Sequence, residues 1–267
     1  MNKKNIVEQI RKKKSFLCIG LDSDLSKIPS FLRNYDDPIY EFNKRIIDAT
    51  NDLCVAYKPN IAFYEALGSK GWDALSKTLK YIPKNILTIA DAKRADIGNT
   101  AKKYAETFFS TYNFDALTVA PYMGEDSVTP FLEYTNKWSI ILGLTSNMGS
   151  KSFQNLVLKN GNQLYKSVLE QSSKWGNVEN TMFVIGATKV QELKEVRKII
   201  PNHFLLIPGI GAQGGNLEEV IKNGINNDVG LLINSSRGII YAGNNENFAE
   251  KARYEAQLIR KKMAKYL

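Results

Sequence analysis

The chain has 267 residues, of which 43% are hydrophobic and 24% are charged, and its formal net charge is +9 at pH 7. This composition is ordinary for a globular protein, and no stretch approaches the roughly 18 consecutive apolar residues of a membrane span. The single histidine excludes a cage of several histidines around a metal, so acid and base chemistry falls to lysine, aspartate, glutamate or tyrosine.

The N-terminal sequence, the cysteines and the basic clusters predict where the protein is located and what it binds. The opening "MNKKNIVEQIRKKKS" lacks the apolar centre of a signal peptide, which predicts a cytoplasmic protein. Cys18 and Cys54 lie inside apolar runs and match no metal-ligand spacing, so we expect two reduced, buried thiols. Much of the positive charge lies in "RKKK" and "RKKMAK" without a recognised binding motif. We therefore expect no nucleic-acid partner and no membrane contact; the charge would at most attract an anionic small substrate.

Eight short apolar runs with polar or turn residues at their ends predict eight β-strands. The first four are "SFLCIGLD" (15–22), "LCVAYKPN" (53–60), "NILTIADAK" (85–93) and "ALTVAPY" (116–122). The other four are "SIILGLTS" (139–146), "TMFVIGAT" (181–188), "HFLLIPG" (203–209) and "VGLLINSS" (229–236).

Segments with apolar residues at three- and four-residue spacing alternate with these strands and predict helices. Continuous apolar strands that alternate with helices indicate a parallel sheet covered on both faces, and eight such units predict an α/β fold of the closed (β/α)8 TIM barrel type. A doubly wound open sheet is the alternative. Because no Pro-, Gly- or Ser-rich linker divides the chain, residues 1–267 are expected to form a single domain. The predicted helices include residues 38–52, 99–112, 162–175, 190–200 and 216–224.

Polar residues follow the ends of the predicted strands, where the active sites of such barrels are built. His203 instead falls at the start of strand seven, the end of the barrel that serves stability, so it is not a catalytic candidate. The polar strand ends are Asp22, Lys58, Asp91 with Lys93, Thr145 with Ser146, "PGIGAQGG" (208–215) and "NSSRG" (234–238).

Because side chains on a strand alternate between its two faces, residue spacing predicts which charged side chains lie on the same face. Asp91 and Lys93, in "DAKRADIGNT", should lie on one face of strand three. By the same rule Asp22 shares a face with Gly20 and Cys18, which are small enough to leave room for a ligand inside the barrel.

Lys93 lies between two carboxylates, Asp91 and Asp96, which should stabilise its ammonium form. A Schiff-base lysine would need the free amine, so Lys93 is expected to be a proton donor. The alternative is a salt-bridge network that fastens the strands together. Asp96 precedes a predicted helix and either folds back over Lys93 or reaches a neighbouring subunit.

The runs after strands seven and eight are suited to phosphate. "PGIGAQGG" holds four glycines in eight residues and precedes a predicted helix, so its backbone amides can surround an anion. Arg237, in "NSSRG", carries a guanidinium that matches two phosphate oxygens. Loops after strands seven and eight often hold phosphate in this fold, although glycines alone also mark tight turns.

Six motifs in this order resemble the orotidine 5'-phosphate decarboxylase family, whose members make uridine monophosphate in pyrimidine biosynthesis. The chain is similar to the longer branch of the family. The form fused to a phosphoribosyltransferase is not expected, because the barrel uses the whole chain. The resemblance rests on "GLDSD" (20–24), "YKPN" (57–60), "DAKRADIGNT" (91–100), "LTSN" (144–147), "PGIGAQGG" (208–215) and "SSRG" (235–238).

The resemblance implies a nucleotide substrate and a Lys-Asp-Lys-Asp array made of Lys58, Asp91, Lys93 and Asp96. Asp22 and Lys58 would hold the ribose hydroxyls, and Asp91 would lie beside the substrate carboxylate. Lys93 would protonate the carbanion left at C6 of the pyrimidine after carbon dioxide departs.

Family members are dimers with shared active sites, so the resemblance implies that Asp96 and Thr100 enter the active site of a partner subunit. Ser146 would read the pyrimidine edge, and the segment "NMGSKSFQ" (147–154) would cover the base. The residues that would close the phosphate end are Pro208, Gln213, Ser236 and Arg237.

The resemblance implies neither a metal nor an organic cofactor, with catalysis by positioning and by a preorganised electrostatic site. Two alternatives stay open. One is a magnesium-dependent sugar-phosphate decarboxylase or synthase of the same barrel superfamily, which shares the "DxKxxD" pattern but is disfavoured by "DIGNT" and "PGIGAQGG". The other is a basic nucleic-acid-binding protein that keeps the barrel without activity.

Overall fold

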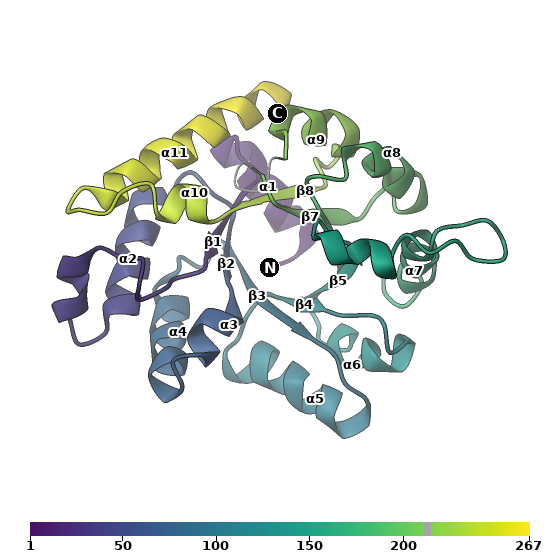
Figure 1. The fold of residues 1–267 in the computed structure, drawn as a ribbon, viewed down its shortest axis with the longest axis horizontal. Helices are drawn as coiled ribbons and strands as arrows, with labels where there is room; N and C mark the ends of the chain where they lie inside the picture. Colours follow the sequence, from purple (N-terminus) through teal and green to yellow (C-terminus); the bar gives the residue numbers. More distant parts are fainter. Residues whose placement is uncertain (211–214) are drawn as a thin grey trace. The chain divides into compact units, whose positions relative to one another are not determined.

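Eight parallel strands form the centre of the molecule. In the computed structural model, which describes residues 1–210 and 215–267, the strands pair in sequence order and close into a barrel (Figure 1). The TIM-barrel prediction is therefore confirmed, and the open-sheet alternative is wrong. Each strand lies within its predicted range or extends it by one residue. The strands are β1 (Leu17–Leu21), β2 (Ala56–Pro59), β3 (Leu87–Arg94), β4 (Ala116–Val119), β5 (Trp138–Leu144), β6 (Thr181–Ile185), β7 (Phe204–Pro208) and β8 (Leu231–Ser235).

The contacts within the chain divide it into two compact units. The first holds residues 3–92 and 234–267 with Met1, and the second holds residues 93–233 with Asn2. The boundary falls inside β3, between Ala92 and Lys93, and again inside β8.

In the first unit the helices cover the outside of the first strands. Figure 1 shows α2 and α4 beside β1 and β2, and α2 packs against both α4 and α11. The side chain of Asp37 caps α2 by accepting a hydrogen bond from the amide of Tyr40, and Pro38 fits the first helical turn. The helices are α1 (Lys3–Lys13), α2 (Pro38–Thr50), α3 (Ile61–Glu65), α4 (Ser69–Tyr81), α10 (Arg237–Ile240) and α11 (Phe248–Met263), with short 3₁₀ turns η1 (Ser30–Asn34) and η5 (Ala264–Tyr266).

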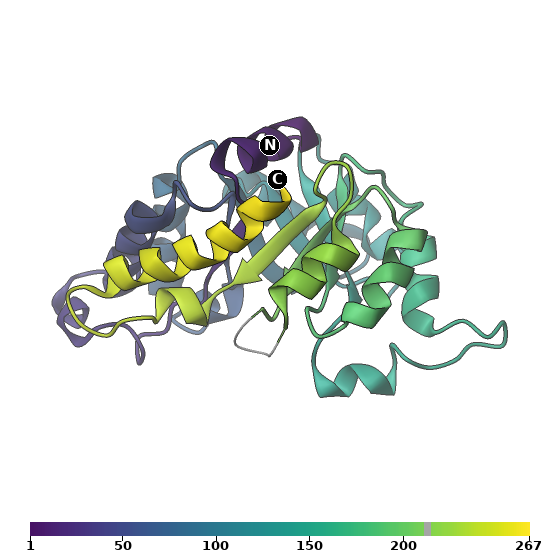
Figure 2. The same cartoon turned by 90° about the horizontal axis from the view of Figure 1, so that it is seen from above.

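In the second unit α7 packs on β5, and α8 packs on both α7 and α9. The predicted helix at 99–112 changes at Thr107 into a π-helical turn. The segment 155–163 projects away from the helices in two views (Figures 1 and 2). The helices are α5 (Gly98–Glu106), α6 (Thr129–Leu132), α7 (Leu164–Ser172), α8 (Val190–Ile199) and α9 (Leu217–Gly224), with short turns η2 (Thr107–Thr111), η3 (Glu125–Ser127) and η4 (Met148–Ser152).

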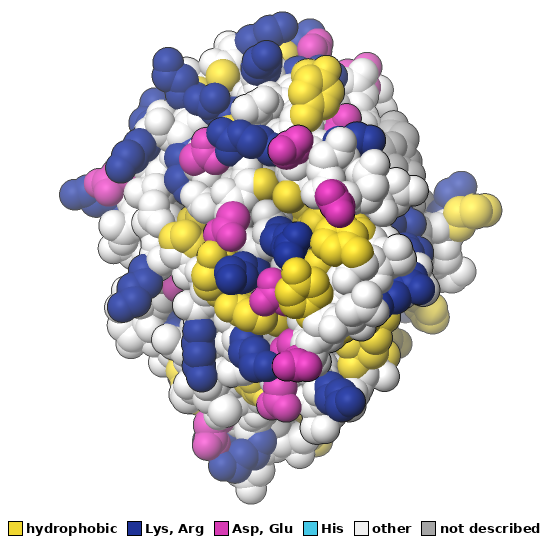
Figure 3. Space-filling model, turned by 90° about the vertical axis from the view of Figure 1, so that its left-hand side faces the viewer, with side chains coloured by type: hydrophobic (Ala, Val, Ile, Leu, Met, Phe, Trp, Pro, Cys, Tyr) yellow, Lys and Arg dark blue, Asp and Glu magenta, His cyan; other side chains and the backbone are white. Residues whose placement is uncertain are grey.

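The two cysteines lie in the core, as their apolar flanking residues predict. Cys18 and Cys54 are buried free thiols, which confirms the prediction of two reduced, buried thiols, and burial raises the pKa of Cys54 to about 12. On the face that Figure 3 presents, acidic side chains lie among the lysines and arginines. Within residues 1–210 and 215–267, no helix combines the length and the apolar character needed to cross a membrane.

Candidate active site

Lys58 and Asp91 form a buried ion pair at the ends of neighbouring strands. Lys58 of β2 is in register with Gly20 of β1, and Asp91 of β3 is bridged to Asn60 just after β2. The Nζ of Lys58 lies 2.6 Å from Oδ2 of Asp91, and Lys58 is only 4% exposed. Because little water reaches the pair, the two charges interact strongly and hold each other in place.

The charge state of Lys58 follows from two opposing effects. Burial lowers the pKa of Lys58, but the negative charges of Asp91 and Asp22 outweigh burial, so the pKa is raised above its ordinary value. Lys58 is therefore a cation at neutral pH. It can donate hydrogen bonds and stabilise negative charge, but it cannot act as a general base.

Asp22 brings a carboxylate oxygen that lacks a donor. The residue follows the end of β1 and is half-buried. Among the residues that the structure describes, none donates a hydrogen bond to its Oδ1, although this atom is buried. Buried polar atoms are almost always hydrogen-bonded, so this oxygen is suited to a donor that comes with a ligand, such as a hydroxyl group.

The space above Gly20 is occupied by protein. A Cβ atom at Gly20 would lie 1.8 Å from Oγ of Ser236. Nδ2 of Asn234 donates to that same Oγ at 3.3 Å, while Oδ1 of Asn234 accepts from Sγ of Cys18 at 3.6 Å. The expectation that Gly20 leaves room for a ligand is thus wrong; glycine is needed there because Ser236 fills the space.

Arg237 follows directly after Ser236 and opens α10. Its side chain is exposed, whereas Ser236 is half-buried. The first unit therefore brings together Asp22, Lys58 and Asp91, and it also holds Ser236 and Arg237 at the end of β8.

Lys93 lies in the second unit and has an unusual backbone. Its φ angle is +50°, a conformation that side-chain-bearing residues adopt rarely, and its amide donates to Oγ1 of Thr118 at 2.9 Å. Its side chain is exposed. Because regular strand alternation ends at this residue, parity alone no longer implies that Asp91 and Lys93 point the same way. Strained residues of this kind often occur at functional sites, although Lys14 also has a φ angle of +50°.

Asp96 and Thr100 lie around the start of α5. Oδ1 of Asp96 accepts the amide of Ile97 at 2.8 Å, and Ile97 is 56% exposed. Thr100 is exposed in the first turns of α5. The structure describes one chain, so their role in a partner's site stays a prediction.

Ser146 and Pro208 also lie in the second unit. Ser146 follows β5, and a Cβ atom at Gly186 would lie 2.8 Å from its Cβ, so glycine permits this close approach. Pro208 ends β7, and its carbonyl accepts the amide of Ala187 at 2.9 Å. Gln213 lies outside the described residues.

The segment predicted to cover the base, residues 147–154, contains the short 3₁₀ turn η4. It ends at Gln154, which hydrogen-bonds to Thr145. The amide of Thr145 donates to Oε1 of Gln154 at 2.8 Å, and Nε2 of Gln154 donates back to Oγ1 of Thr145 at 2.9 Å. Met148 is 90% exposed between these anchors. Whether the segment closes over a ligand stays a prediction.

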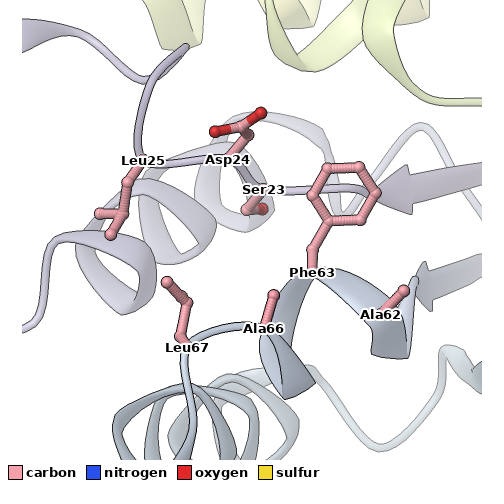
Figure 4. A pocket seen from close by; sticks show the side chains of 7 residues that line it. All are labelled: Ser23, Asp24, Leu25, Ala62, Phe63, Ala66 and Leu67. Atoms are coloured by element: carbon pink, nitrogen blue, oxygen red, sulfur yellow. The ribbon is translucent and has the colours of Figure 1, made fainter.

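A cavity of about 340 Å³ lies beside the turn that carries Asp22. Figure 4 shows that its side chains come from the loop after β1 and from α3 and the turn that follows it. Neither Lys58 nor Asp91 lines this cavity, so it adjoins the charged residues without containing them. The lining residues are Ser23, Asp24, Leu25, Ala62, Phe63, Ala66 and Leu67.

Two tyrosines near Asp22 were missed by the sequence analysis. Tyr64 of α3 and Tyr241, just after α10, both hydrogen-bond the turn at residues 21–24. No periodicity or motif marks them, because their partners are distant in the chain. The only signal was that "NSSRG" continues as "IIYA", which puts a tyrosine four residues after Arg237.

His203 is a buried residue that packs against an aromatic ring. His203 is 8% exposed, and its ring meets that of Phe183 edge to face with centroids 5.4 Å apart. It precedes β7 at the amino-terminal end of the strand. Across the parts of the chain that the structure describes, no three His, Cys, Asp or Glu side chains form a group able to hold a metal ion.

The chain matches a known protein family over most of its length. Residues 15–252 match the model described as "Orotidine 5'-phosphate decarboxylase / HUMPS family". A curated relative from Bacteroides fragilis, named orotidine 5'-phosphate decarboxylase, is 57% identical over 270 residues, which cover 100% of this chain and 98% of the relative.

Solved structures show the same likeness. The Leishmania donovani OMP decarboxylase is 36% identical with a TM-score of 0.81, over 98% of this chain and 100% of that one. The Leishmania donovani UMP synthase is 38% identical with a TM-score of 0.84, over 96% of this chain. The matched part makes up 56% of that longer protein.

Proposed function

The chain belongs to the orotidine 5'-phosphate decarboxylase / HUMPS family, and we propose that it decarboxylates orotidine 5'-monophosphate to uridine 5'-monophosphate in pyrimidine biosynthesis. The structural observation that carries the proposal is the buried Lys58–Asp91 pair beside the donor-less oxygen of Asp22. A fixed cation next to a carboxylate oxygen without a donor suits a ligand that offers hydroxyl groups and carries negative charge.

The ribose is held by Asp22 and Lys58. The buried Oδ1 of Asp22 accepts from a ribose hydroxyl, which replaces the hydrogen bond that the folded chain does not supply. The ammonium group of Lys58 donates to a ribose oxygen while it keeps its bond to Asp91. This arrangement selects a ribonucleotide over a ligand without hydroxyls.

The phosphate is bound by the residues after strands seven and eight. Arg237 is exposed and supplies a guanidinium that can contact two phosphate oxygens at once. Binding free energy from the phosphate, remote from the reacting carbon, helps stabilise the transition state. The other residues proposed for the phosphate are Pro208, Gln213 and Ser236.

The chemical step uses Asp91 and Lys93. Asp91 lies beside the substrate carboxylate, so repulsion between these two negative groups destabilises the bound substrate. The repulsion is weaker in the transition state, in which negative charge moves to C6. The bond between C6 and the carboxylate breaks, its electron pair stays on C6, and carbon dioxide leaves. The ammonium group of Lys93 then gives its proton to C6, which forms the C–H bond of the product. Ser146 contacts the pyrimidine edge.

Asp96 and Thr100 complete the site of a partner subunit in a homodimer. The start of α5 supports this proposal, since Ile97 beside Asp96 is an exposed apolar side chain that a subunit interface would cover. We further propose that the two compact units act as one domain and that the enzyme works in the cytoplasm.

The reaction proceeds without metal or organic cofactor. This proposal is tested by following the loss of the orotate absorbance with purified protein and excess chelator. We expect turnover that the chelator leaves unchanged. A strict need for added Mg²⁺ would contradict the metal-free mechanism and favour a sugar-phosphate enzyme of the same superfamily. Absence of turnover, together with tight, salt-sensitive binding to nucleic acid, would instead favour an inactive binding scaffold.

A further inference from the structure

The turn that carries Asp22 is held by two phenol groups. Beyond Leu21 the chain leaves the β-ladder, so its backbone groups need other partners. Tyr64 donates its hydroxyl proton to the carbonyl of Leu21 at 3.2 Å. Tyr241 donates to the carbonyl of Asp22 at 2.8 Å and accepts from the amide of Asp24 at 2.8 Å. The main chain on both sides of the Asp22 side chain is thereby fixed.

Tyr241 is itself held firmly. Its ring stacks on Phe42 with centroids 5.8 Å apart and planes 23° apart, and Phe42 stacks in turn on Phe248 at 5.2 Å. Its amide donates to the carbonyl of Arg237 at 3.2 Å, which closes the turn of α10. One residue therefore connects the chain at Arg237 with the chain at Asp22.

The protonation of Tyr241 suits this contact. Burial raises the pKa of Tyr241 to about 12; the hydrogen bond from the amide of Asp24 lowers the pKa, and the charges of Asp24 and Asp22 raise it. The phenol keeps its proton at neutral pH and can donate it to the Asp22 carbonyl.

The second phenol belongs to a buried polar network. Nδ2 of Asn43 donates to the hydroxyl of Tyr64 and to Oγ1 of Thr78, both at 3.0 Å, while Oδ1 of Asn43 accepts from the hydroxyl of Ser23. The network reaches the residue directly after Asp22, so the turn is supported from inside the first unit as well.

We propose that Tyr241 is a positioning residue that orients the carboxylate of Asp22 toward a ribose hydroxyl. It also couples this orientation to the position of the turn that begins at Arg237. The proposal rests on the proposed function, in which Asp22 receives that hydroxyl. Both hydrogen bonds of the Tyr241 hydroxyl are to backbone atoms, so the buried Oδ1 of Asp22 keeps its capacity for the ligand.

The test compares two nucleotides that differ only in their hydroxyls. The variant Tyr241→Phe retains the ring that stacks on Phe42 and loses both hydrogen bonds of the phenol. We expect its affinity for uridine 5'-monophosphate to fall roughly five- to thirty-fold, the equivalent of one or two hydrogen bonds. Its affinity for the 2',3'-dideoxy nucleotide should stay close to that of the wild type, as measured by calorimetry. Asp22→Asn should show the same selectivity, and the double variant should lose little more.

A matched control separates positioning from stability. Tyr57→Phe also removes a buried phenol, which bonds to Thr50 at 2.7 Å and to the carbonyl of Ile47 at 3.3 Å, away from the turn. It should lower the melting temperature without changing the ratio of the two affinities. If Tyr241→Phe does not fold, Tyr64→Phe, which frees the carbonyl of Leu21, should show the same selective loss.

The results of these measurements distinguish a failure of the Tyr241 proposal from a failure of the proposed function. An equal loss of affinity for both nucleotides, or no loss for either, would overturn the role of Tyr241. Wild-type protein that discriminates the two nucleotides without decarboxylating the substrate would refute the proposed function alone.

Discussion

Lys58 is the residue in which burial and charge oppose each other most directly. Burial in β2 disfavours its ammonium form, yet Asp91 at 2.6 Å and the charge of Asp22 keep it protonated. A lysine at a strand end was recognisable in "YKPN", but its partner lies 33 residues further along the chain. The pairing depends on the register between β2 and β3, which no local pattern specifies.

Removal of Lys58 should destabilise the protein because it leaves Asp91 buried without its cation. We expect Lys58→Met to lower the free energy of unfolding by about 3–5 kcal/mol in urea titrations. The double variant Lys58→Met with Asp91→Leu should regain part of that loss, since the charge of Asp91 is gone and only Asp22 still lacks its neighbouring cation. Lys77→Met is the control, because Lys77 pairs with Asp37 at 2.9 Å on the surface and should change stability very little.

The pH dependence of this difference follows from the raised pKa of Lys58. A base whose folded pKa exceeds the unfolded value of 10.5 contributes stability fully below that value and loses it as pH rises through the folded pKa. The gap between wild type and Lys58→Met should therefore be constant from neutral pH to about pH 9 and should narrow only in strong alkali. A gap that closes near neutrality would contradict the charged pair.

At the scale of elements, the contact between the ends of β1 and β8 decides the shape of the site. Ser236 occupies the space that glycine leaves at position 20, and Asn234 ties it to Cys18. The missing side chain of Gly20 suggests room for a ligand in the sequence alone, because strand parity cannot show which distant side chain fills the gap.

The variant Gly20→Ala should displace Ser236 and the turn that follows it. We expect a loss of about 1–3 kcal/mol in stability from the overlap, and a rise in KM as Arg237 moves from its place. Combining it with Ser236→Gly should restore stability. Gly238→Ala serves as the stability control, since among the described residues no atom beyond its chain neighbours and the backbone of its own helix lies within 4 Å of its added Cβ. A double variant no more stable than Gly20→Ala would show that the overlap is not the cause.

At the scale of the whole molecule, the proposed active site shared between two subunits depends on the segment that follows β3. The segment 91–100 runs directly from the end of β3 into α5. The same short segment therefore carries Lys93 for one site and, by our proposal, Asp96 for the site of a partner subunit.

Mixed dimers test this division. Lys93→Ala and Asp96→Ala should each be nearly inactive alone, whereas a mixture that has exchanged subunits should regain up to about a quarter of wild-type activity. Half of the dimers are then hybrids with one intact site of two. Subunit exchange is verified with differently tagged chains. Exchange without any recovered activity would contradict the role of Asp96 across the interface.

The sequence by itself determined the strands, the barrel and the identity of the charged residues, because apolar runs, helical spacing and ordered motifs are local properties. It placed Asp22, Lys58 and Asp91 at strand ends, and the structure brings these three together. It could not show that φ at Lys93 is +50°, nor that Gln154 anchors Thr145.

Only the tertiary structure decided how the Asp22 turn is held. The hydroxyl of Tyr241 reaches the carbonyl of Asp22 from 219 residues away, and Ser236 fills the gap at Gly20 across a similar distance in the chain. Such contacts depend on which elements the closed barrel places side by side. Their donors and acceptors pair because the backbone beyond a strand end has lost its ladder partners.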